Sequence, residues 1–404
     1  NLCIVNDPNG RPDRSPDPFA VGDIRNTDRG VAIKSKMNKP YQFAVLVLLV
    51  AVAVGFSLVN TPEGANTEGI DVMNETEAVE MKEEEFQRAK PLINPTGYIN
   101  TDNVSIEDNI GEKVILLDMW TYSCINCQRT LPHLKEWNRK YSDDGLLIIG
   151  NHAPEFDFEK KRSNVEDAVE KYNLTYPIVL DNNYGTWNAY NNRYWPQKYL
   201  IGVDGFIRYE HIGEGRYEQT EEKVRELLKE LKMRKGQNPT LTDEIGQSPE
   251  EEQLDSTDVN SDMIKTPEIY LGAYRNDYLA NGKNGTTGVQ KLTVPENLEK
   301  NRLYLDGEWI FEEEYAENSG SGEILLRYEA KRVNMVLEGD NTTVTVYQDG
   351  ELVSESAGRD VENGRVKVGD EQLYNMVANE DYGEHKLRIE VEQGDLKAYT
   401  FTFG

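Results

Sequence analysis

The sequence predicts an α/β domain followed by an all-β sandwich, with one transmembrane helix ahead of both. Three observations predict this order. Residues 43–59 carry no charge, residues 89–235 alternate short apolar runs with amphipathic stretches, and residues 267–404 contain strand-like runs separated by turn signals. A chain of 404 residues is also long enough for two folded domains with connecting segments.

The apolar run predicts a membrane anchor at residues 41–60. At about 1.5 Å per residue, a helix over this run nearly spans a hydrocarbon core. Lysines precede it and acidic residues follow it: Lys34, Lys36 and Lys39, then Glu63, Glu68 and Asp71. The positive-inside rule therefore places the N-terminus in the cytoplasm and everything after Asn60 outside the membrane. A cleaved signal peptide is the alternative, although the run is not followed by a strong small-x-small cleavage site.

Three segments have compositions that are not expected to form a hydrophobic core. Residues 1–40 are expected to be a disordered N-terminal tail or an upstream extension, because their Pro, Asp, Arg and Gly content supports no packing. Residues 61–88 are acidic and are expected to form a solvated spacer. Residues 236–266 have little apolar periodicity and are expected to form a linker.

The α/β domain is expected at residues 89–235. Short apolar runs predict buried strands, and amphipathic runs predict helices that cover them. The Asp204-Gly205 pair predicts a hairpin turn. The expected strands are 114–120, 146–149, 176–180, 199–203 and 206–212, and the expected helices are 125–141, 165–172 and 221–231. Alternating strands and helices imply α/β packing.

The C-terminal segment, residues 267–404, changes to a strand pattern. The runs 324–326, 344–347 and 387–391 are strand-like, and 399–403 alternates apolar and polar residues. Asp349-Gly350 predicts another hairpin. We therefore expect a β-sandwich here.

Charge and cysteine content limit the possible functions. There are 72 acidic and 44 basic residues, a net charge of −28. Nucleic acid is not an expected partner, because phosphate binding needs a basic face. The simplest interpretation of the acidity is a solvated surface, with an acidic face for a cationic partner as the alternative. With three cysteines, the chain is not a disulfide-stapled scaffold.

Cys124 and Cys127 form the one close cysteine pair, while Cys3 stands apart. A predicted strand leads into the pair and a predicted helix leaves it. Cys124 is thus expected at a helix N-terminus, where free N–H groups and the helix dipole stabilise a thiolate. Cys127, within one turn, can attack a mixed disulfide on Cys124 and release the product. A zinc half-site is the alternative, but the sequence has no second CxxC or CxxH, so we expect no metal and no cofactor.

The run WTYSCINCQRTLPHL, residues 120–134, resembles the active-site strand and helix of the thioredoxin superfamily. It is most similar to the extracytoplasmic TlpA/DipZ-like branch, and the resemblance covers about residues 95–231. It implies thiol-disulfide exchange, with Asp118 as the buried acid that moves a proton to or from Cys127. It also implies that Pro132 kinks the active-site helix and that Pro196 is a cis-proline shaping the substrate groove.

Aromatic residues near these positions are expected to line that groove, although core packing is the alternative for the tryptophans: Trp120, Tyr122 and Trp195. We expect His152 to be structural rather than a ligand. The Thr121–Cys124 spacing also resembles that of thiol peroxidases of the peroxiredoxin type, but position 117 is Leu where a proline would be expected. Copper delivery, as by thioredoxin-fold copper chaperones, is a further alternative. Those proteins carry a CxxxC motif, whereas this chain has CxxC.

The two ends of the C-terminal segment, residues 266–272 and 399–404, resemble the last domain of DipZ-like proteins, a sandwich similar to carbohydrate-binding modules. Tyr270, Tyr274 and Trp309 could stack on a sugar, but an interaction or structural domain is the preferred interpretation.

Together these features predict a membrane-anchored, extracytoplasmic thiol-disulfide oxidoreductase that acts on protein thiols and disulfides. Cytochrome c maturation and disulfide reduction are the roles implied by the resemblance, which also implies a separate CcdA-like membrane electron partner. The direction of electron flow stays open. The alternatives are a metal- or glycan-binding extracytoplasmic protein and a thiol peroxidase.

Overall fold

The structure, a computed structural model, describes residues 3–4, 85–242, 244–246 and 263–404. The predicted tail and the predicted anchor at residues 41–60 lie outside the described residues, except for the short strand at residues 3–4. Most of the predicted spacer at residues 61–88 also lies outside them. Among the helices that the structure does describe, none is both long enough and apolar enough to cross a membrane.

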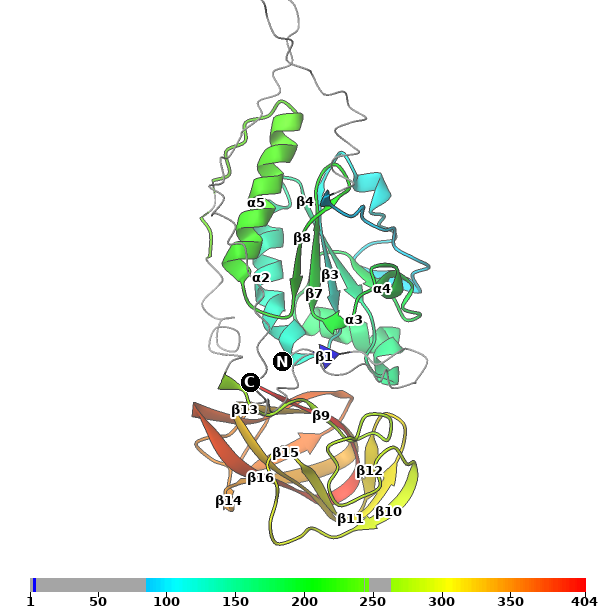
Figure 1. Ribbon diagram of the computed structural model, residues 1–404, viewed down its shortest axis with the longest axis vertical. Coiled ribbons are helices and arrows are strands. Elements are labelled where there is room, and N and C mark those ends of the chain that lie inside the picture. Colours follow the sequence, from blue (N-terminus) through cyan, green and yellow to red (C-terminus); the bar gives the residue numbers. More distant parts are fainter. Residues whose placement is uncertain (1–2, 5–84, 243, 247–262) are drawn as a thin grey trace, which may run out of the picture. The chain divides into compact units, whose positions relative to one another are not determined.

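A six-stranded mixed sheet forms the centre of the first domain (Figure 1). In spatial order its strands are β2 (Gly97–Ile99), β5 (Ile178–Leu180), β4 (Leu146–His152), β3 (Val114–Trp120), β7 (Gln197–Ile201) and β8 (Ile207–Ile212). β3, β4 and β5 run parallel, and the other pairings are antiparallel. β3 is buried along its whole length, as expected for an apolar strand covered on both faces.

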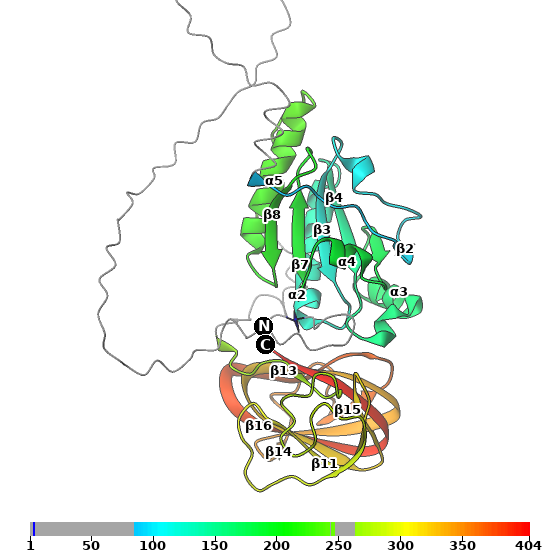
Figure 2. The same cartoon turned by 45° about the vertical axis from the view of Figure 1, so that its right-hand side comes forward.

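Helices cover both faces of this sheet (Figures 1 and 2). α2 (Ile125–Tyr141) and α5 (Tyr217–Arg234) lie on one side, and α3 (Arg162–Lys171) and the short α4 (Gly185–Ala189) lie on the other. Two short 3-10 helices, η1 (Glu107–Asn109) and η2 (Asp157–Lys160), complete the connections. The predicted α/β domain is therefore confirmed, and we use this name for β2 to α5.

Several elements of this domain agree with local features of the sequence. α2 has the predicted bounds and contains Pro132. The predicted hairpin joins β7 to β8, and Gly205 adopts a φ of 80° there, a conformation that favours glycine. A short strand, β6 (Tyr194–Trp195), lies just before β7 and pairs antiparallel with β1 (Cys3–Ile4).

The second domain is all β, as predicted, and we call it the β-domain. Its strands are β9 (Ile269–Tyr270), β10 (Gly288–Leu292), β11 (Leu303–Phe311), β12 (Ala316–Ser319), β13 (Gly322–Gln348), β14 (Glu351–Leu352), β15 (Arg365–Val368) and β16 (Gln372–Phe403). Hydrogen bonds join them in one sheet, whereas two separate sheets were expected for a sandwich. The middle of β13 has a neighbour along each of its edges, and both neighbours belong to β16: Val333 lies opposite Val377 in one pairing and opposite Phe403 in the other.

The α/β domain and the β-domain belong to one compact unit. Each has its own apolar core, but the first core also takes in Val336, Leu373 and Tyr399 of the β-domain. The rings of Phe156 and Phe158 pack on Tyr399 at centroid distances of 5.2 and 4.9 Å. Residues that follow β4 are thereby held against the β-domain.

Candidate active site

The cysteine pair lies where β3 gives way to α2. Cys124 is the N-cap of α2, with extended backbone angles (φ −78°, ψ 117°), and its Sγ accepts a hydrogen bond from the Cys127 backbone N–H at 3.4 Å. A free N–H at a helix start directed at the sulfur is an arrangement that stabilises a thiolate. No disulfide joins the two sulfurs, and both side chains are almost fully buried.

The two thiols differ in their surroundings. Burial raises the pKa of the Cys127 thiol well above its usual value, and hydrogen bonding and charge at Cys124 add to the rise. Asp118 also contributes to it. Cys127 therefore needs a nearby base before it can act as a nucleophile.

Asp118 is a buried carboxyl group whose charge interacts with the Cys127 thiol. It lies on β3, buried to 1% exposure, and burial raises its pKa to about 6. Lys198, opposite it in the β3–β7 register, opposes this rise. The Lys198 Nζ lies 3.7 Å from Asp118 Oδ1, an ion-pair distance that is too long for a hydrogen bond. An acid with a pKa near 6 can both hold and release a proton close to neutral pH.

The segment at Pro196 closes the other side of the pair. The Trp195–Pro196 peptide bond is cis, and the Cys124 thiol points to the Trp195 carbonyl oxygen at 3.9 Å. The Pro196 carbonyl accepts a hydrogen bond from the Gly213 N–H at 2.7 Å. Two chain segments thus meet at the Cys124 sulfur, the start of α2 and the β6–β7 junction, and the turn after β8 is bonded to the second of these.

The three aromatic residues expected in a substrate groove are all buried in this structure. Trp120, 1% exposed, packs edge-on against His152 in the core. The Trp195 indole N–H donates to the Ala153 carbonyl at 3.0 Å. The Tyr122 hydroxyl reaches the Glu371 carbonyl of the β-domain at 3.4 Å. Their role in substrate contact stays a prediction.

His152 is a structural residue here. Its ring is fully buried, stacks near Tyr122 and lies 3.3 Å from the Thr121 hydroxyl. Burial lowers the pKa of His152 to about 3, so the imidazole is neutral at physiological pH. Among the described residues, no group of three or more His, Cys, Asp or Glu side chains is arranged to hold a metal ion.

A second carboxylate supports the loop before Cys124. Glu159, at the end of the segment that follows β4, accepts hydrogen bonds from the Ser123 hydroxyl at 2.7 Å and from the Ser123 N–H at 3.2 Å. It also accepts from the backbone N–H groups of Glu155 and Phe156. Burial raises the pKa of Glu159 to about 7. Hydrogen bonds of the Glu159 side chain therefore connect the loop at residues 121–124, which we call the catalytic loop, to the segment at residues 153–159.

The β-domain adds groups of its own to this segment. Arg275 Nη1 lies 2.9 Å from Glu155 Oε1, and the Tyr270 hydroxyl donates to the same oxygen at 2.8 Å. The Arg275 guanidinium lies over the Tyr270 ring at 3.6 Å. Tyr270 is therefore engaged in this cluster, and Trp309 is fully buried, so of the three aromatic residues considered for a sugar only Tyr274 is exposed (52%).

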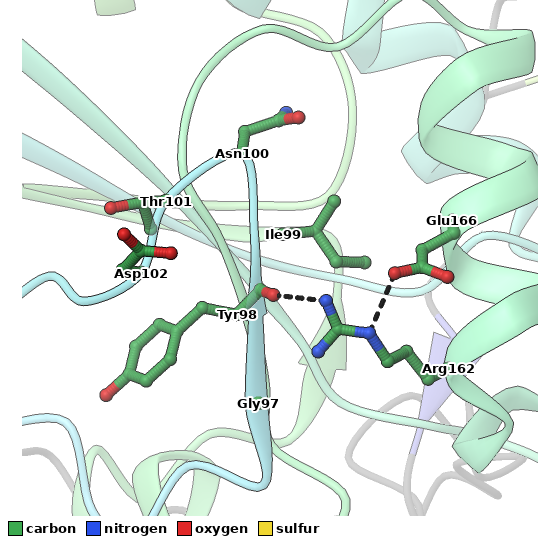
Figure 3. A pocket seen from close by; sticks show the side chains of 8 residues that line it. All are labelled: Gly97, Tyr98, Ile99, Asn100, Thr101, Asp102, Arg162 and Glu166. Atoms are coloured by element: carbon green, nitrogen blue, oxygen red, sulfur yellow. Dashed lines mark hydrogen bonds and ion pairs between the residues drawn. The ribbon is translucent and has the colours of Figure 1, made fainter.

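Two cavities lie near α3. One of about 270 Å³ is lined by Tyr122, by Asn164 and Lys171 of α3, and by residues 370–373 of the β-domain, so it borders the catalytic loop. The other, about 750 Å³, lies at β2 and α3 and includes neither cysteine (Figure 3). In the second cavity Arg162 bonds the Tyr98 carbonyl at 2.8 Å and Glu166 at 2.7 Å. Only the first of these cavities is close to the redox pair.

Sequence reasoning missed four charged residues around the site: Lys198, Glu155, Glu159 and Arg275. A lysine inside the apolar strand that follows Pro196 was the one available signal, because a buried charge needs a partner. Nothing in the sequence relates Glu155 to Arg275, which is 120 positions away.

Sequence comparisons relate both domains of this chain to known protein families. Residues 85–210 match the AhpC/TSA family, and residues 266–404 match the family described as thioredoxin like C-terminal domain. Protein DipZ of Mycobacterium tuberculosis is 34% identical over 312 residues, 76% of this chain and 42% of its own length. The chain thus spans less than half of that relative.

Smaller relatives match the α/β domain. The thiol-disulfide oxidoreductase ResA of Halalkalibacterium halodurans is 32% identical over 136 residues, 31% of this chain and 74% of its own length. The thiol-disulfide oxidoreductase YkuV of Bacillus subtilis is 28% identical over 31% of this chain and 85% of its length. Among solved structures, StoA of Bacillus subtilis is similar, with 24% identity, coverage of 33% of this chain and 97% of that chain, and a TM-score of 0.29.

Proposed function

The chain belongs to the thioredoxin-like thiol-disulfide oxidoreductases, and from this premise we propose that Cys124 is its attacking thiol and Cys127 its resolving thiol. The observation that carries the proposal is the position of Cys124 at the N-cap of α2, with the Cys127 N–H directed at its sulfur. Cys127 follows within one turn, and its thiol has a pKa that burial raises, so Cys124 is the better first nucleophile and Cys127 the resolving thiol.

The proposed reaction transfers two electrons to a protein disulfide. The Cys124 thiolate attacks one substrate sulfur, so that a mixed disulfide forms and the second substrate sulfur leaves as a thiolate that takes up a proton. Asp118 then accepts the proton of Cys127. The Cys127 thiolate attacks the Cys124 sulfur, which releases the first substrate sulfur as a thiol after protonation and leaves the Cys124–Cys127 disulfide.

We further propose that the pair works as a reductant. Three carboxyl groups, Asp118, Glu155 and the partly exposed Glu214, each have a pKa that burial raises and that negative charge on Cys124 raises further. The same repulsion acts in reverse and opposes the Cys124 thiolate. Since a stabilised reduced form makes an oxidant, surroundings that oppose the thiolate favour the disulfide and electron donation.

Two measurements test this function. Cys124→Ser should abolish the reduction of insulin by the full chain, while Cys3→Ser, the control, should retain it. The midpoint potential of the pair should lie near that of thioredoxin, roughly −270 mV, rather than near roughly −120 mV, the value of a strong oxidant. Full activity of the Cys124→Ser variant would remove the assignment, and an oxidising potential would reverse the direction.

The predicted anchor gives the proposed location. We propose that residues 41–60 hold the α/β domain and the β-domain on the outer side of a membrane, supported by the charges that flank the apolar run. A CcdA-like membrane protein is the proposed electron donor, with cytochrome c maturation or general disulfide reduction as the task. Protease digestion of intact and lysed cells tests the location: both domains should be cut in intact cells whose outer surface is accessible.

A thiol peroxidase is the second candidate, because residues 85–210 match the AhpC/TSA family and Thr121 stands three positions before Cys124. However, the Thr121 hydroxyl lies 3.3 Å from the buried His152 ring, where it is engaged beside the core. We therefore expect no peroxide consumption above that of the Cys124→Ser variant in a dithiothreitol-coupled assay. Peroxide turnover dependent on Cys124 would favour the peroxidase.

A further inference from the structure

A buried cluster joins the β-domain to the segment beside the redox pair. Glu155, whose side chain is 4% exposed, extends from the segment after β4 and meets Arg275 and Tyr270 of the β-domain at 2.9 and 2.8 Å. The Arg275 guanidinium also lies 5.5 Å from the centre of the Phe156 ring. A carboxylate removed from water to this degree needs such a cation and donor to remain charged.

The same segment supports the active site on two sides. The Ala153 carbonyl accepts the Trp195 indole N–H, and Trp195 carries the carbonyl that faces the Cys124 sulfur. On the other side, the Glu155 N–H donates to the Glu159 carboxylate, which holds Ser123. The backbone of residues 153–155 therefore contacts groups on both sides of Cys124.

Charge interactions connect Glu155 both to Arg275 and to Cys124. Burial raises the pKa of Glu155, Arg275 opposes that rise, and negative charge on Cys124 adds to it, so the carboxylate and the sulfur lie within electrostatic range of each other. The groups that dominate the surroundings of Arg275 are Tyr270, Glu155 and Glu268. Arg275 thus interacts with Glu155, with which it shares an ion pair at 2.9 Å, and Glu155 in turn interacts electrostatically with Cys124.

We propose that Glu155 is a positioning residue of the redox centre, held charged by Arg275 and Tyr270, and that the β-domain thereby sets how readily Cys124 forms its thiolate. This inference rests on the proposed role of Cys124 as the attacking thiol. It gives the β-domain a part in the redox chemistry itself, through side chains that it places beside the α/β domain.

Glu155→Gln and Arg275→Met in the full chain test the proposal. The readout is the rate of iodoacetamide alkylation of Cys124 as a function of pH, followed by mass spectrometry on the reduced protein. Glu155→Gln removes the opposing charge, and Arg275→Met leaves a buried carboxyl that takes up a proton. Both should shift the alkylation profile to lower pH by about half a unit, which is about threefold more thiolate below the midpoint. The rate gain should be about twofold, since nucleophilicity falls with basicity.

Two further variants serve as controls. Arg275→Lys keeps the cation and should keep the original profile. Arg388→Met removes a comparable arginine elsewhere in the β-domain, one that pairs with Glu323 at 2.8 Å and lies over the Tyr347 ring at 3.8 Å, and it should shift nothing. Circular dichroism confirms that each variant is folded.

An unshifted profile in folded Glu155→Gln protein would overturn the inference, even if Arg275→Met failed to fold. An equal shift in Arg388→Met would also overturn it, because the effect would then be unspecific. Neither outcome touches the proposed function, which fails separately if Cys124→Ser still reduces insulin.

Discussion

Replacing Asp118 with asparagine should flatten the pH dependence of folding stability in the reduced protein. Asp118 is 1% exposed, and burial raises its pKa from 3.8 to about 6 despite the nearby Lys198. The folded state therefore holds the proton more tightly than the unfolded state. Asparagine keeps a similar shape but does not titrate in this range.

The size of the effect follows from the shift in pKa. Each pKa unit corresponds to about 1.4 kcal/mol, so a rise of about two units corresponds to about 3 kcal/mol. Because the folded pKa is raised, this contribution is fully present below pH 3.8 and is lost as the pH rises through about 6. Between pH 4 and pH 7.5, the wild type should lose about 2.4 kcal/mol more stability than Asp118→Asn does, because part of the contribution is already lost at pH 4.

Tryptophan fluorescence during urea unfolding is a suitable assay. Four of the five tryptophans, Trp120, Trp137, Trp187 and Trp195, lie in the α/β domain, so the signal reports mainly on the domain that contains Asp118. A reductant keeps the cysteine pair as dithiols at each pH. Other buried acids such as Glu159 titrate in both proteins, and their contributions cancel in the difference.

One result of comparing the wild type with Asp118→Asn would contradict the prediction. Equal pH dependence in the wild type and Asp118→Asn would show that the carboxyl titrates at its ordinary pKa, and the buried-acid reasoning would fail. Lys198→Met gives an independent check with the opposite sign, because loss of the cation should raise the pKa of Asp118 further and enlarge the loss of stability. Glu226→Gln, at an exposed position on α5, is the matched control and should leave the curve unchanged.

Two other predictions concern the catalytic pair and its loop. Cys127→Ser should accumulate a mixed disulfide between Cys124 and a substrate protein, visible on non-reducing gels and absent from Cys124→Ser, since the resolving thiol is missing. If no adduct forms, Cys127 is not the resolving group. Ser123→Ala should lower stability at pH 7.5 by about 1–3 kcal/mol, because the buried Glu159 loses a hydroxyl donor at 2.7 Å. A loss below about 0.5 kcal/mol in urea unfolding would show that this bond supports little.

Much of the fold was predictable because local patterns define it. The helix at residues 125–141 has the expected bounds, since its apolar spacing and the cysteine before it mark where it begins. The hairpin at Asp204-Gly205 was predictable because glycine at the second position allows the positive φ that the turn requires. The all-β character of residues 267–404 was predictable from their strand-like runs, but the pairing of the middle of β13 with two stretches of β16 has no local signal.

Local spacing predicted the part of the site that neighbours in sequence create, and the family resemblance added the distant cis-proline Pro196. Cys124 and Cys127 are brought together by one helical turn, so their spacing alone indicates exchange chemistry. The pairing of Asp118 with Lys198 depends on the register between β3 and β7, and the sequence does not specify that register. The burial of Trp120 agrees with the buried strand predicted at residues 114–120, whereas contact of Trp120 with a substrate stays a prediction.

The sequence by itself therefore determined which chemistry this protein can perform, because a CxxC pair at a helix start brings a nucleophile and its resolving thiol together through covalent spacing. The tertiary structure alone decided the electrostatic setting of that pair. Lys198, Glu155, Glu159 and Arg275 reach it from separate strands, loops and a second domain. Burial and charge depend on contacts between distant segments, and these contacts exist only once the chain has folded.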